Sequence, residues 1–239
     1  MNEPMIEALR LSKYYGPFVA VGDVSFSIPQ GQVVALLGPN GAGKTTILRM
    51  LTGYLAPSEG TARIAGFDVL RDRLEVAARI GYLPENGPLY LDMTPLEMLR
   101  FAGEARRLGA AHWRARLDAV AAQCEITNVL DKPIGKLSKG LRQRVGVALA
   151  LLHDPAVLIM DEPTAGLDPN QIRHFRAHVR ALQHQKTLIV STHILQEVDA
   201  IADRVLLIHG GKLVFDGTPN DLAEHGSLEE PFHRLTHSE

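Results

Sequence analysis

The fold is decided by residues 38–46, which read Gly38-Pro39-Asn40-Gly41-Ala42-Gly43-Lys44-Thr45-Thr46. This stretch directly follows residues 33–37, an apolar run of the kind that forms a buried strand. Glycines let the backbone curl so that its N–H groups face phosphate oxygens, while Lys44 supplies a positive charge and Thr45 a hydroxyl for Mg²⁺. A chance glycine-rich turn is the alternative interpretation, and the preceding strand argues against it. The stretch therefore predicts a nucleotide phosphate-binding loop between a strand and a helix.

Outward from this loop, short apolar runs with strand character alternate with helical patterns. The expected strands are residues 33–37, 80–83, 157–160, 187–191 and 205–208. This alternation predicts an α/β fold with a mainly parallel sheet covered by helices. Additional strands, which we interpret as an antiparallel flank, are expected at residues 6–11, 24–28 and 61–64. The pair Gly210-Gly211 predicts a hairpin turn, because glycine tolerates positive φ.

Between residues 94 and 154 helical signals replace the strand pattern, which predicts an inserted helical subdomain. Thr94-Pro95-Leu96-Glu97 has the form of a capping box with proline at the first helical position. Leu96, Leu99 and Phe101 are expected on or near one face of this helix. Two later helices are expected to open in the same way, at Asp168-Pro169 and Thr218-Pro219.

Composition narrows the class of protein. The 239 residues are 46% hydrophobic, enough to bury a sizeable core, and the net charge of -2 gives no broad positive field to attract nucleic acid. Cys124 is the single cysteine, so we expect a buried apolar residue and neither a disulfide framework nor a cysteine-rich zinc site. The acidic N-terminal segment lacks the features of a signal peptide. The longest apolar run, residues 145–152, is far below the roughly 20 residues that span a bilayer, so any membrane role is expected to be peripheral.

A second candidate site follows the predicted strand 157–160, where the sequence continues Asp161-Glu162-Pro163-Thr164. Asp161 is suited to act on a metal through its water shell, and Glu162 to polarise a water in line with a γ-phosphate. A solvated acidic strand end would look the same in isolation. The phosphate loop upstream favours the functional interpretation.

Thr192-His193 follows the predicted strand 187–191. A histidine here could reach a γ-phosphate oxygen, although a lone histidine at a strand end is more often a hydrogen-bonded or exposed side chain. The catalytic interpretation of His193 therefore depends on its position relative to the other motifs.

The motif that gives His193 its context is residues 137–144, which read Leu137-Ser138-Lys139-Gly140-Leu141-Arg142-Gln143-Arg144. The order of phosphate loop, Q-loop, Leu-Ser signature, carboxylate strand, D-loop and switch histidine resembles the nucleotide-binding domain of ABC transporters. The resemblance extends from Tyr15 to about Gly217. It implies a P-loop NTPase fold with an ABC-type ATPase core. The implied domains are a single ABC ATPase domain over residues 1–239, with a RecA-like core and β flank at 1–93 and 155–239 and a helical signature subdomain at 94–154.

The resemblance also implies a role for each matching residue. The expected ATP-binding residues are Tyr15, which would stack on adenine, and Gly38, Pro39, Asn40, Gly41, Ala42, Gly43, Lys44, Thr45 and Thr46. The expected catalytic residues are Lys44, Glu162 and His193, and the expected metal-facing residues are Thr45, Glu85 and Asp161. Across a dimer interface the signature residues Ser138, Lys139 and Gly140 would meet the other subunit's ATP, and Asp168 of the D-loop would link the two sites. Without the family, Tyr15 is equally well a half-buried core tyrosine.

The chain departs from the common pattern in two places. Lys139 and Leu141 replace the third and fifth residues of the usual Leu-Ser-Gly-Gly-Gln signature, while Ser138 and Gly140 are retained. Glu85 stands at the Q-loop position normally held by glutamine. Glu85 and the residues after it resemble the branch of gliding-motility-associated and related ABC-2-type export ATPases, which favours export.

The family resemblance thus predicts an ATP-binding and ATP-hydrolysing subunit that uses ATP and Mg²⁺. It would dimerise with itself or with a related ATPase subunit. It would work with separate transmembrane permease subunits, from a cytoplasmic, peripheral position on the inner face of the cell membrane. A soluble ABC-type ATPase that remodels ribosomes or DNA is the alternative, but the chain shows no tandem cassettes or long charged linker. A small-molecule kinase or a GTPase is disfavoured by the signature and by the missing Asn-Lys-x-Asp motif.

Overall fold

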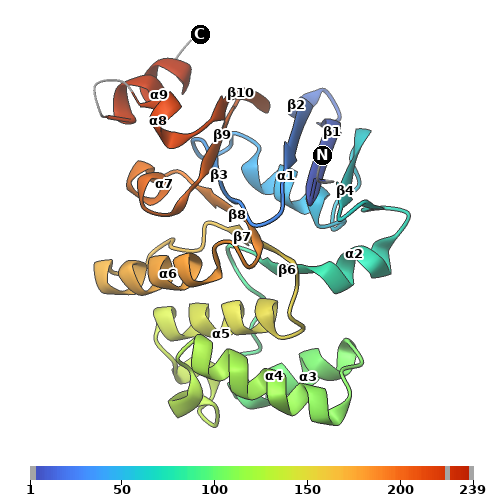
Figure 1. Ribbon diagram of the computed structural model, residues 1–239, viewed down its shortest axis with the longest axis vertical. Helices are drawn as coiled ribbons and strands as arrows, with labels where there is room; N and C mark the ends of the chain where they lie inside the picture. Colours follow the sequence, from blue (N-terminus) through green and yellow to red (C-terminus); the bar gives the residue numbers. More distant parts are fainter. Residues whose placement is uncertain (1–3, 224–226, 237–239) are drawn as a thin grey trace.

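The computed structural model describes residues 4–223 and 227–236. Residues 1–3, 224–226 and 237–239 lie outside the described residues. The family resemblance places them in the RecA-like part of the domain, at 1–93 and 155–239. The described chain contains a six-stranded and a four-stranded sheet with helices around them (Figure 1).

The larger sheet has the strand order β10-β9-β3-β8-β7-β6. Its strands are β3 (Val33–Leu37), β6 (Ile80–Leu83), β7 (Val157–Asp161), β8 (Thr187–Thr192), β9 (Arg204–His209) and β10 (Lys212–Gly217). All neighbours are parallel except β9 and β10, which form the predicted hairpin. Every residue of β3, β7 and β8 is buried, as expected for strands covered on both faces. The predicted parallel α/β core is confirmed.

The smaller sheet is antiparallel, with the order β2-β1-β4-β5, and confirms the predicted flank. Its strands are β1 (Ile6–Tyr15), β2 (Phe18–Ile28), β4 (Glu59–Ile64) and β5 (Phe67–Asp68). The first two are longer than predicted, because their ladder continues through exposed residues up to the turn that joins them. The sequence pattern marks only the buried part of such a hairpin.

One hydrophobic core joins the two sheets. Helix α1 (Lys44–Leu51) buries Ile47 and Leu48 there, against side chains of β1 and β3. The alternate residues of β3, Ala35 and Leu37, face a second core under α7 (Leu195–Ile201) and the C-terminal helices α8 (Pro219–Leu222) and α9 (Glu229–Thr236). Strand β3 is therefore packed from both sides, which makes its carboxyl end a rigid base for the loop that follows.

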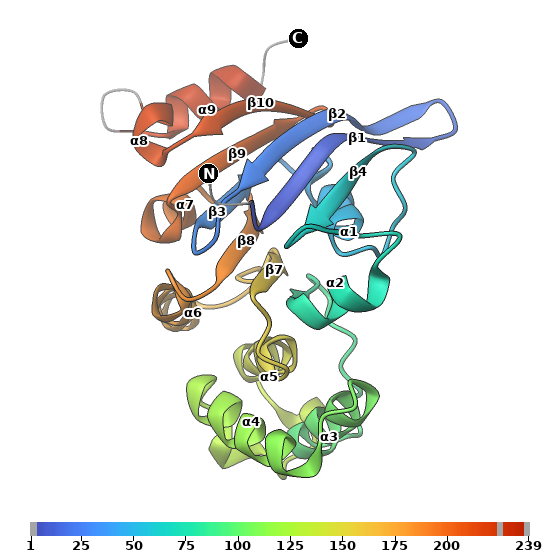
Figure 2. The ribbon, with the colours of Figure 1, turned by 45° about the vertical axis from the view of Figure 1, so that its right-hand side comes forward.

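Residues 94–154 contain α3 (Pro95–Ala105), α4 (Ala110–Gln123), two short 3₁₀ turns (Thr127–Val129 and Ile134–Lys136) and α5 (Lys139–Leu151). Figures 1 and 2 show α3, α4 and α5 together at the end of the molecule away from the antiparallel sheet, with α2 (Arg73–Arg79) and α6 (Pro169–Leu182) nearer to them. Helices α3, α4, α5 and α6 share a core with β7 and β8 through residues such as Leu99, Val145 and Met160.

The predicted helix starts are confirmed as capping boxes at Thr94, Asp168 and Thr218. On α3, Leu99 is buried and Leu96 packs against the core, but the expectation for Phe101 was wrong. Phe101 lies two residues after Leu99 and therefore on a different side of the helix from the buried face. At the surface it contacts Tyr90 edge-on.

Cys124 is buried as expected, and burial raises the pKa of its thiol to about 12. Among residues 4–223 and 227–236, none of the helices combines the length and the hydropathy that a membrane crossing requires.

Candidate functional site

The candidate site lies at one edge of the larger sheet. Strands β3, β8, β7 and β6 are consecutive and parallel, so their carboxyl ends meet at this edge. The phosphate loop follows β3, His193 follows β8, Asp161 ends β7, and Glu85 comes shortly after β6. Ligands of open α/β sheets bind outside the carboxyl ends of the strands. The strand order thus gathers four motifs that are far apart in the sequence.

The loop after β3 presents its backbone to the site. Gly43, directly before α1, has φ 105°, and a Cβ atom there would lie 2.6 Å from the carbonyl oxygen of Ala20. No side chain caps the first turn of α1. Its N–H groups and the positive end of the helix dipole are therefore available to an anion, as phosphate binding requires.

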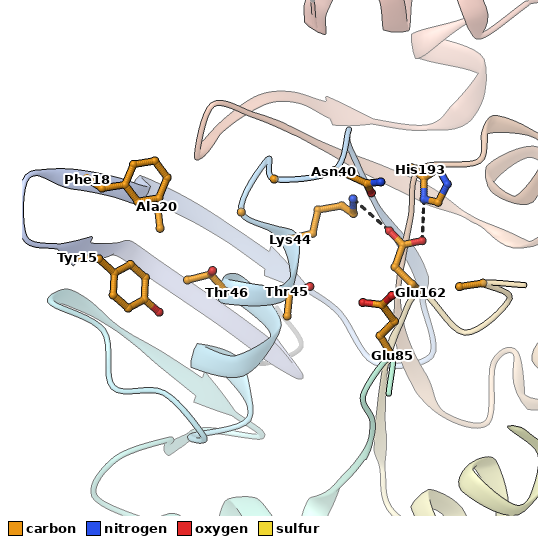
Figure 3. A pocket seen from close by; sticks show the side chains of 13 residues that line it. Tyr15, Phe18, Ala20, Asn40, Lys44, Thr45, Thr46, Glu85, Glu162 and His193 are labelled. Carbon is orange, nitrogen blue, oxygen red and sulfur yellow. Dashed lines mark hydrogen bonds and ion pairs between the residues drawn. The ribbon is translucent and has the colours of Figure 1, made fainter. Parts of the chain in front are cut away.

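Lys44 points into the site from the first turn of α1 and is only 5% exposed. Its Nζ donates to the carbonyl oxygens of Gly38 at 2.7 Å and Pro39 at 3.2 Å. It also lies 3.1 Å from Oε1 of Glu162, as an ion pair (Figure 3). The carbonyl groups of the loop thus hold the Lys44 side chain over the loop itself.

The two adjacent carboxylates at the end of β7 face different partners. Asp161 is buried and accepts hydrogen bonds from Thr45 Oγ1 at 3.2 Å and Ser191 Oγ at 2.6 Å. Glu162 adopts a left-handed backbone, with φ 46°. Its backbone N–H donates to the same Ser191 hydroxyl, at 2.8 Å. This turn in the chain separates the two side chains, so that Asp161 meets the loop threonine and Glu162 meets Lys44.

His193 follows β8 directly, and its Nδ1 lies 2.9 Å from Oε2 of Glu162. Glu162 therefore has a cation or ring nitrogen on each carboxylate oxygen, Lys44 on one and His193 on the other (Figure 3). This arrangement fixes where the Glu162 carboxylate points. It is also the arrangement expected if Glu162 is a base and the neighbouring His193 hydrogen-bonds phosphate.

These residues line a cavity of about 490 Å³. The predicted residues that line it are Tyr15, Asn40, Gly41, Gly43, Lys44, Thr45, Thr46, Glu85, Glu162 and His193. Figure 3 shows Tyr15 and Phe18 at one end, Glu162, His193 and Glu85 at the other, and Lys44, Thr45 and Thr46 between them. An aromatic end and a charged end joined by a phosphate loop match the shape and chemistry of a nucleoside triphosphate.

Phe18, Ala20 and Ala165 also line the cavity, and sequence reasoning missed them. Phe18 is 62% exposed and Tyr15 is 50% exposed, on the two sides of the β1–β2 turn. An aromatic residue just after the turn residues Gly16-Pro17 was the available signal for Phe18. The pairing of Phe18 with Tyr15, however, depends on hairpin register, which the sequence does not state.

The oxygen groups near Lys44 suit Mg²⁺ bound mainly through phosphate. Thr45 Oγ1 and Asp161 Oδ1 are in contact, and the Glu85 carboxylate lines the same cavity. Within the described ranges no cluster of three or more acidic, histidine or cysteine side chains could hold a metal alone. Mg²⁺ is typically bound by one or two protein oxygens together with substrate phosphates, so the residues fit this ion.

The signature residues do not line the cavity. Ser138 is exposed and caps α5 by accepting from the N–H of Leu141 at 3.3 Å. Lys139 is exposed, and its Nζ packs against Gly166. Gly140 is buried where a Cβ atom would lie 2.6 Å from Cδ of Gln171.

Asp168, the D-loop residue, also lies away from the cavity and caps α6 by accepting from Asn170 and Gln171. Within one chain the signature and Asp168 therefore have local structural roles. A contact between the signature and nucleotide would require a nucleotide that is bound to a second subunit.

Comparison with known proteins gives consistent matches. A family model described as ABC transporter matches residues 21–165. The ABC transporter ATP-binding protein NatA of Bacillus subtilis is 41% identical over 214 residues, 88% of this chain and 87% of NatA. The Nod factor export ATP-binding protein I of Ralstonia nicotianae is 38% identical over 226 residues, which are 94% of this chain and 70% of that protein.

Solved structures agree with this fold. The structure of an ATP-binding subunit of an ABC transporter has a TM-score of 0.87 and 30% identity, and the match covers 97% of this chain and 99% of that one. A bacterial ABC transporter cassette solved as a dimer has a TM-score of 0.81 and 25% identity, with 90% of this chain and 99% of that one covered.

Proposed function

The chain belongs to the ABC transporter ATP-binding proteins and is an ATP-hydrolysing subunit of this family; from this premise we propose how its own residues bind and cleave ATP. The observation that carries the proposal is the meeting of Lys44, Glu162 and His193 at the charged end of one cavity. Tyr15 and Phe18 form the other end and would stack on adenine. The loop residues 38–46 would surround the phosphates.

In the proposed reaction a water attacks the γ-phosphorus while the bond to the bridging oxygen of ADP breaks. Glu162 accepts the proton of this water, which leaves ADP and inorganic phosphate. Lys44 stabilises negative charge on the β and γ phosphates, and His193 hydrogen-bonds the γ-phosphate beside Glu162. Thr45, Asp161 and Glu85 are the residues that would hold Mg²⁺, and the ion supplies further charge stabilisation on the phosphate oxygens.

ABC ATPase subunits dimerise and work with transmembrane permease partners, as the dimeric cassette and the transporter relatives illustrate. We propose a head-to-tail dimer, of two copies or with a related subunit, in which Ser138, Lys139 and Gly140 complete the partner's ATP site. The exposed, serine-capped start of α5 supports this, because its N–H groups can receive a phosphate. Asp168 would link the two sites, and residues 94–154 would move as one helical unit. ATP binds the closed dimer better than the open one, so it shifts the population toward closure.

The permease docking site that we propose is a groove of about 590 Å³ between the core and residues 94–154. It is lined by residues after β6, such as Pro84 and Gly87, and by apolar side chains such as Met98 on α3 and Leu74 on α2. Leu74 and Tyr54, which both line this groove, are 86% and 77% exposed, and exposed apolar side chains that gather in one groove mark an interaction site. Docking there would place the subunit peripherally on the cytoplasmic face of the membrane. We favour export because relatives include proteins named for Nod factor export and bacitracin transport; the gliding-motility branch stays a prediction.

Two measurements test this function. Purified chain should release phosphate from ATP without any added acceptor, and an ATP-dependent reaction that requires an acceptor would point to a kinase. Pull-down from solubilised membranes should recover a multi-spanning permease. Recovery of ribosomes or DNA instead would support the alternative of a soluble remodelling ATPase, which the transporter names of the relatives do not favour.

A further inference from the structure

A buried carboxylate outside the proposed ATP-contacting set links the two loops that carry Glu162 and His193. Glu197 lies in the first turn of α7 and is only 1% exposed. It does not line the ATP cavity. A buried carboxylate costs free energy unless hydrogen bonds satisfy it, so its partners indicate what it holds in place.

Both carboxylate oxygens of Glu197 have threonine partners. Thr164 Oγ1 donates to Oε1, and Thr192 Oγ1 donates to Oε2 at 2.6 Å. The two hydroxyls are themselves buried. Each oxygen of this buried carboxylate thus accepts a hydrogen bond from a different loop, so Glu197 connects the two loops directly.

Each threonine is next to a residue of the proposed reaction. Thr192 directly precedes His193, and its hydroxyl also accepts from the N–H of Ile194 at 3.1 Å. Thr164 lies two residues after Glu162, within a turn closed by the hydrogen bond from the N–H of Ala165 to the carbonyl of Glu162 at 3.1 Å. Glu197 therefore braces the backbone on either side of the 2.9 Å contact between His193 and Glu162.

We propose that Glu197 is a positioning residue that holds His193 and Glu162 in register for attack on ATP, an inference that rests on the proposed function. It touches neither ATP nor the water. It acts through Thr192 on His193 and through Thr164 on the loop after Glu162. Supporting groups of this kind fix reacting side chains to within a fraction of an ångström, and small displacements lower turnover strongly.

The kinetic test compares Glu197→Ala and Glu197→Gln with Asp199→Asn, an exposed acid on the same helix. Glu197→Ala should lower kcat by about tenfold to a hundredfold with a smaller change in ATP affinity, because the bound geometry is lost and the phosphate loop is kept. Glu197→Gln should retain more activity, since an amide can accept from one threonine and donate to the other. Asp199→Asn should match wild type. Unchanged kcat in Glu197→Ala would overturn the proposal.

A second readout does not depend on turnover. The ring C–H signals of His193, assigned by their loss in His193→Ala, should shift in Glu197→Ala and in Thr192→Val, and stay in place in Asp199→Asn. Unshifted signals in folded Glu197→Ala would show that Glu197 does not position His193. Failure of wild type to bind or cleave ATP would instead reject the proposed function, so the two failures are distinguishable.

The energetic coupling between Thr192 and His193 gives a third test. If Thr192 acts through His193, adding Thr192→Val to His193→Ala should cost little further activity, although each change alone is costly. Full additivity of the two losses would assign Thr192 and Glu197 a general structural role and reject the positioning role.

Discussion

Lys44 Nζ and Glu162 Oε1 lie 3.1 Å apart, so the cation expected to bind phosphate is paired with the carboxylate expected to activate water. Phosphate oxygens that attract Lys44 must compete with this carboxylate. When Lys44 turns to phosphate, one oxygen of Glu162 loses its ion-pair partner while the other keeps His193. Capture of the nucleotide and release of the base are thus linked through one contact.

The first prediction concerns Lys44. Lys44→Ala should weaken ATP binding or hydrolysis by at least about tenfold, because it removes the charge that stabilises the β and γ phosphates. Its circular dichroism spectrum should match wild type. Lys212→Ala, which changes an exposed lysine on β10, is the control and should leave ATP hydrolysis unchanged. Near-normal turnover in Lys44→Ala would reject the assignment of Lys44 as the residue that binds the β and γ phosphates.

The second prediction concerns Glu162. Glu162→Gln keeps the shape of the side chain and removes the base, so hydrolysis should fall by about a hundredfold or more while ATP still binds. Binding should not weaken, because glutamine leaves Lys44 free for phosphate. Size-exclusion chromatography should then show a dimer that depends on ATP. A monomer at high protein and ATP concentrations would count against a dimer closed by ATP.

The third prediction tests the signature across the interface. Ser138→Arg should fail alone, because a bulky charge at the start of α5 would block the partner's nucleotide. Mixed with Lys44→Ala, it should regain part of the turnover, since one site then combines a normal phosphate loop with a normal signature. The measurement is phosphate release by mixtures whose mixed dimers are verified. Verified mixed dimers that recover no activity would show that the signature does not act in the partner's site.

The fourth prediction concerns Glu85, which lines the cavity where the family usually has glutamine. Glu85→Gln keeps an oxygen toward the metal or water and should preserve most hydrolysis. Glu85→Ala removes the oxygen, and it should lower basal hydrolysis and lower stimulation by the reconstituted permease more severely. Equal rates and equal stimulation in wild type and both variants would leave Glu85 as a solvent-facing residue without a coupling role.

The fifth prediction concerns stability at acid pH. Burial, and next the nearby Arg106, lower the pKa of His153 from 6.5 to about 4; its Nε2 hydrogen-bonds the carbonyl of Ile80 at 2.8 Å. Below pH 6.5 the unfolded chain takes up a proton that the folded chain excludes. Stability should therefore fall toward pH 4, by at most about 1.4 kcal/mol per pH unit from this group.

His153→Gln tests this assignment, because it keeps a donor for the Ile80 carbonyl and removes the titration. In denaturant unfolding between pH 7 and pH 4, the free energy of unfolding of this variant should fall less steeply than that of wild type, because the contribution of His153 to the slope is removed. His112→Gln, at an exposed position on α4, is the control and should keep the wild-type slope. The same slope in all three proteins would mean that His153 does not govern acid stability.

The sequence by itself determined the features that depend on neighbouring residues. The glycines before Lys44, the uninterrupted apolar runs of β3, β7 and β8, and the boxes at Thr94 and Asp168 each specify their own local geometry. Backbone freedom, burial on both faces of a strand and side-chain capping act within a few residues, so they can be recognised in a single chain.

Only the tertiary structure decided which distant residues meet. The strand order β3-β8-β7-β6 sets His193 against Glu162 and Lys44, and hairpin register sets Phe18 beside Tyr15. Glu197 had no recognisable motif, because its partners Thr164 and Thr192 belong to two loops that only the packed sheet brings together. Strand order and packing follow from burial summed over the whole core, and no local pattern contains that sum.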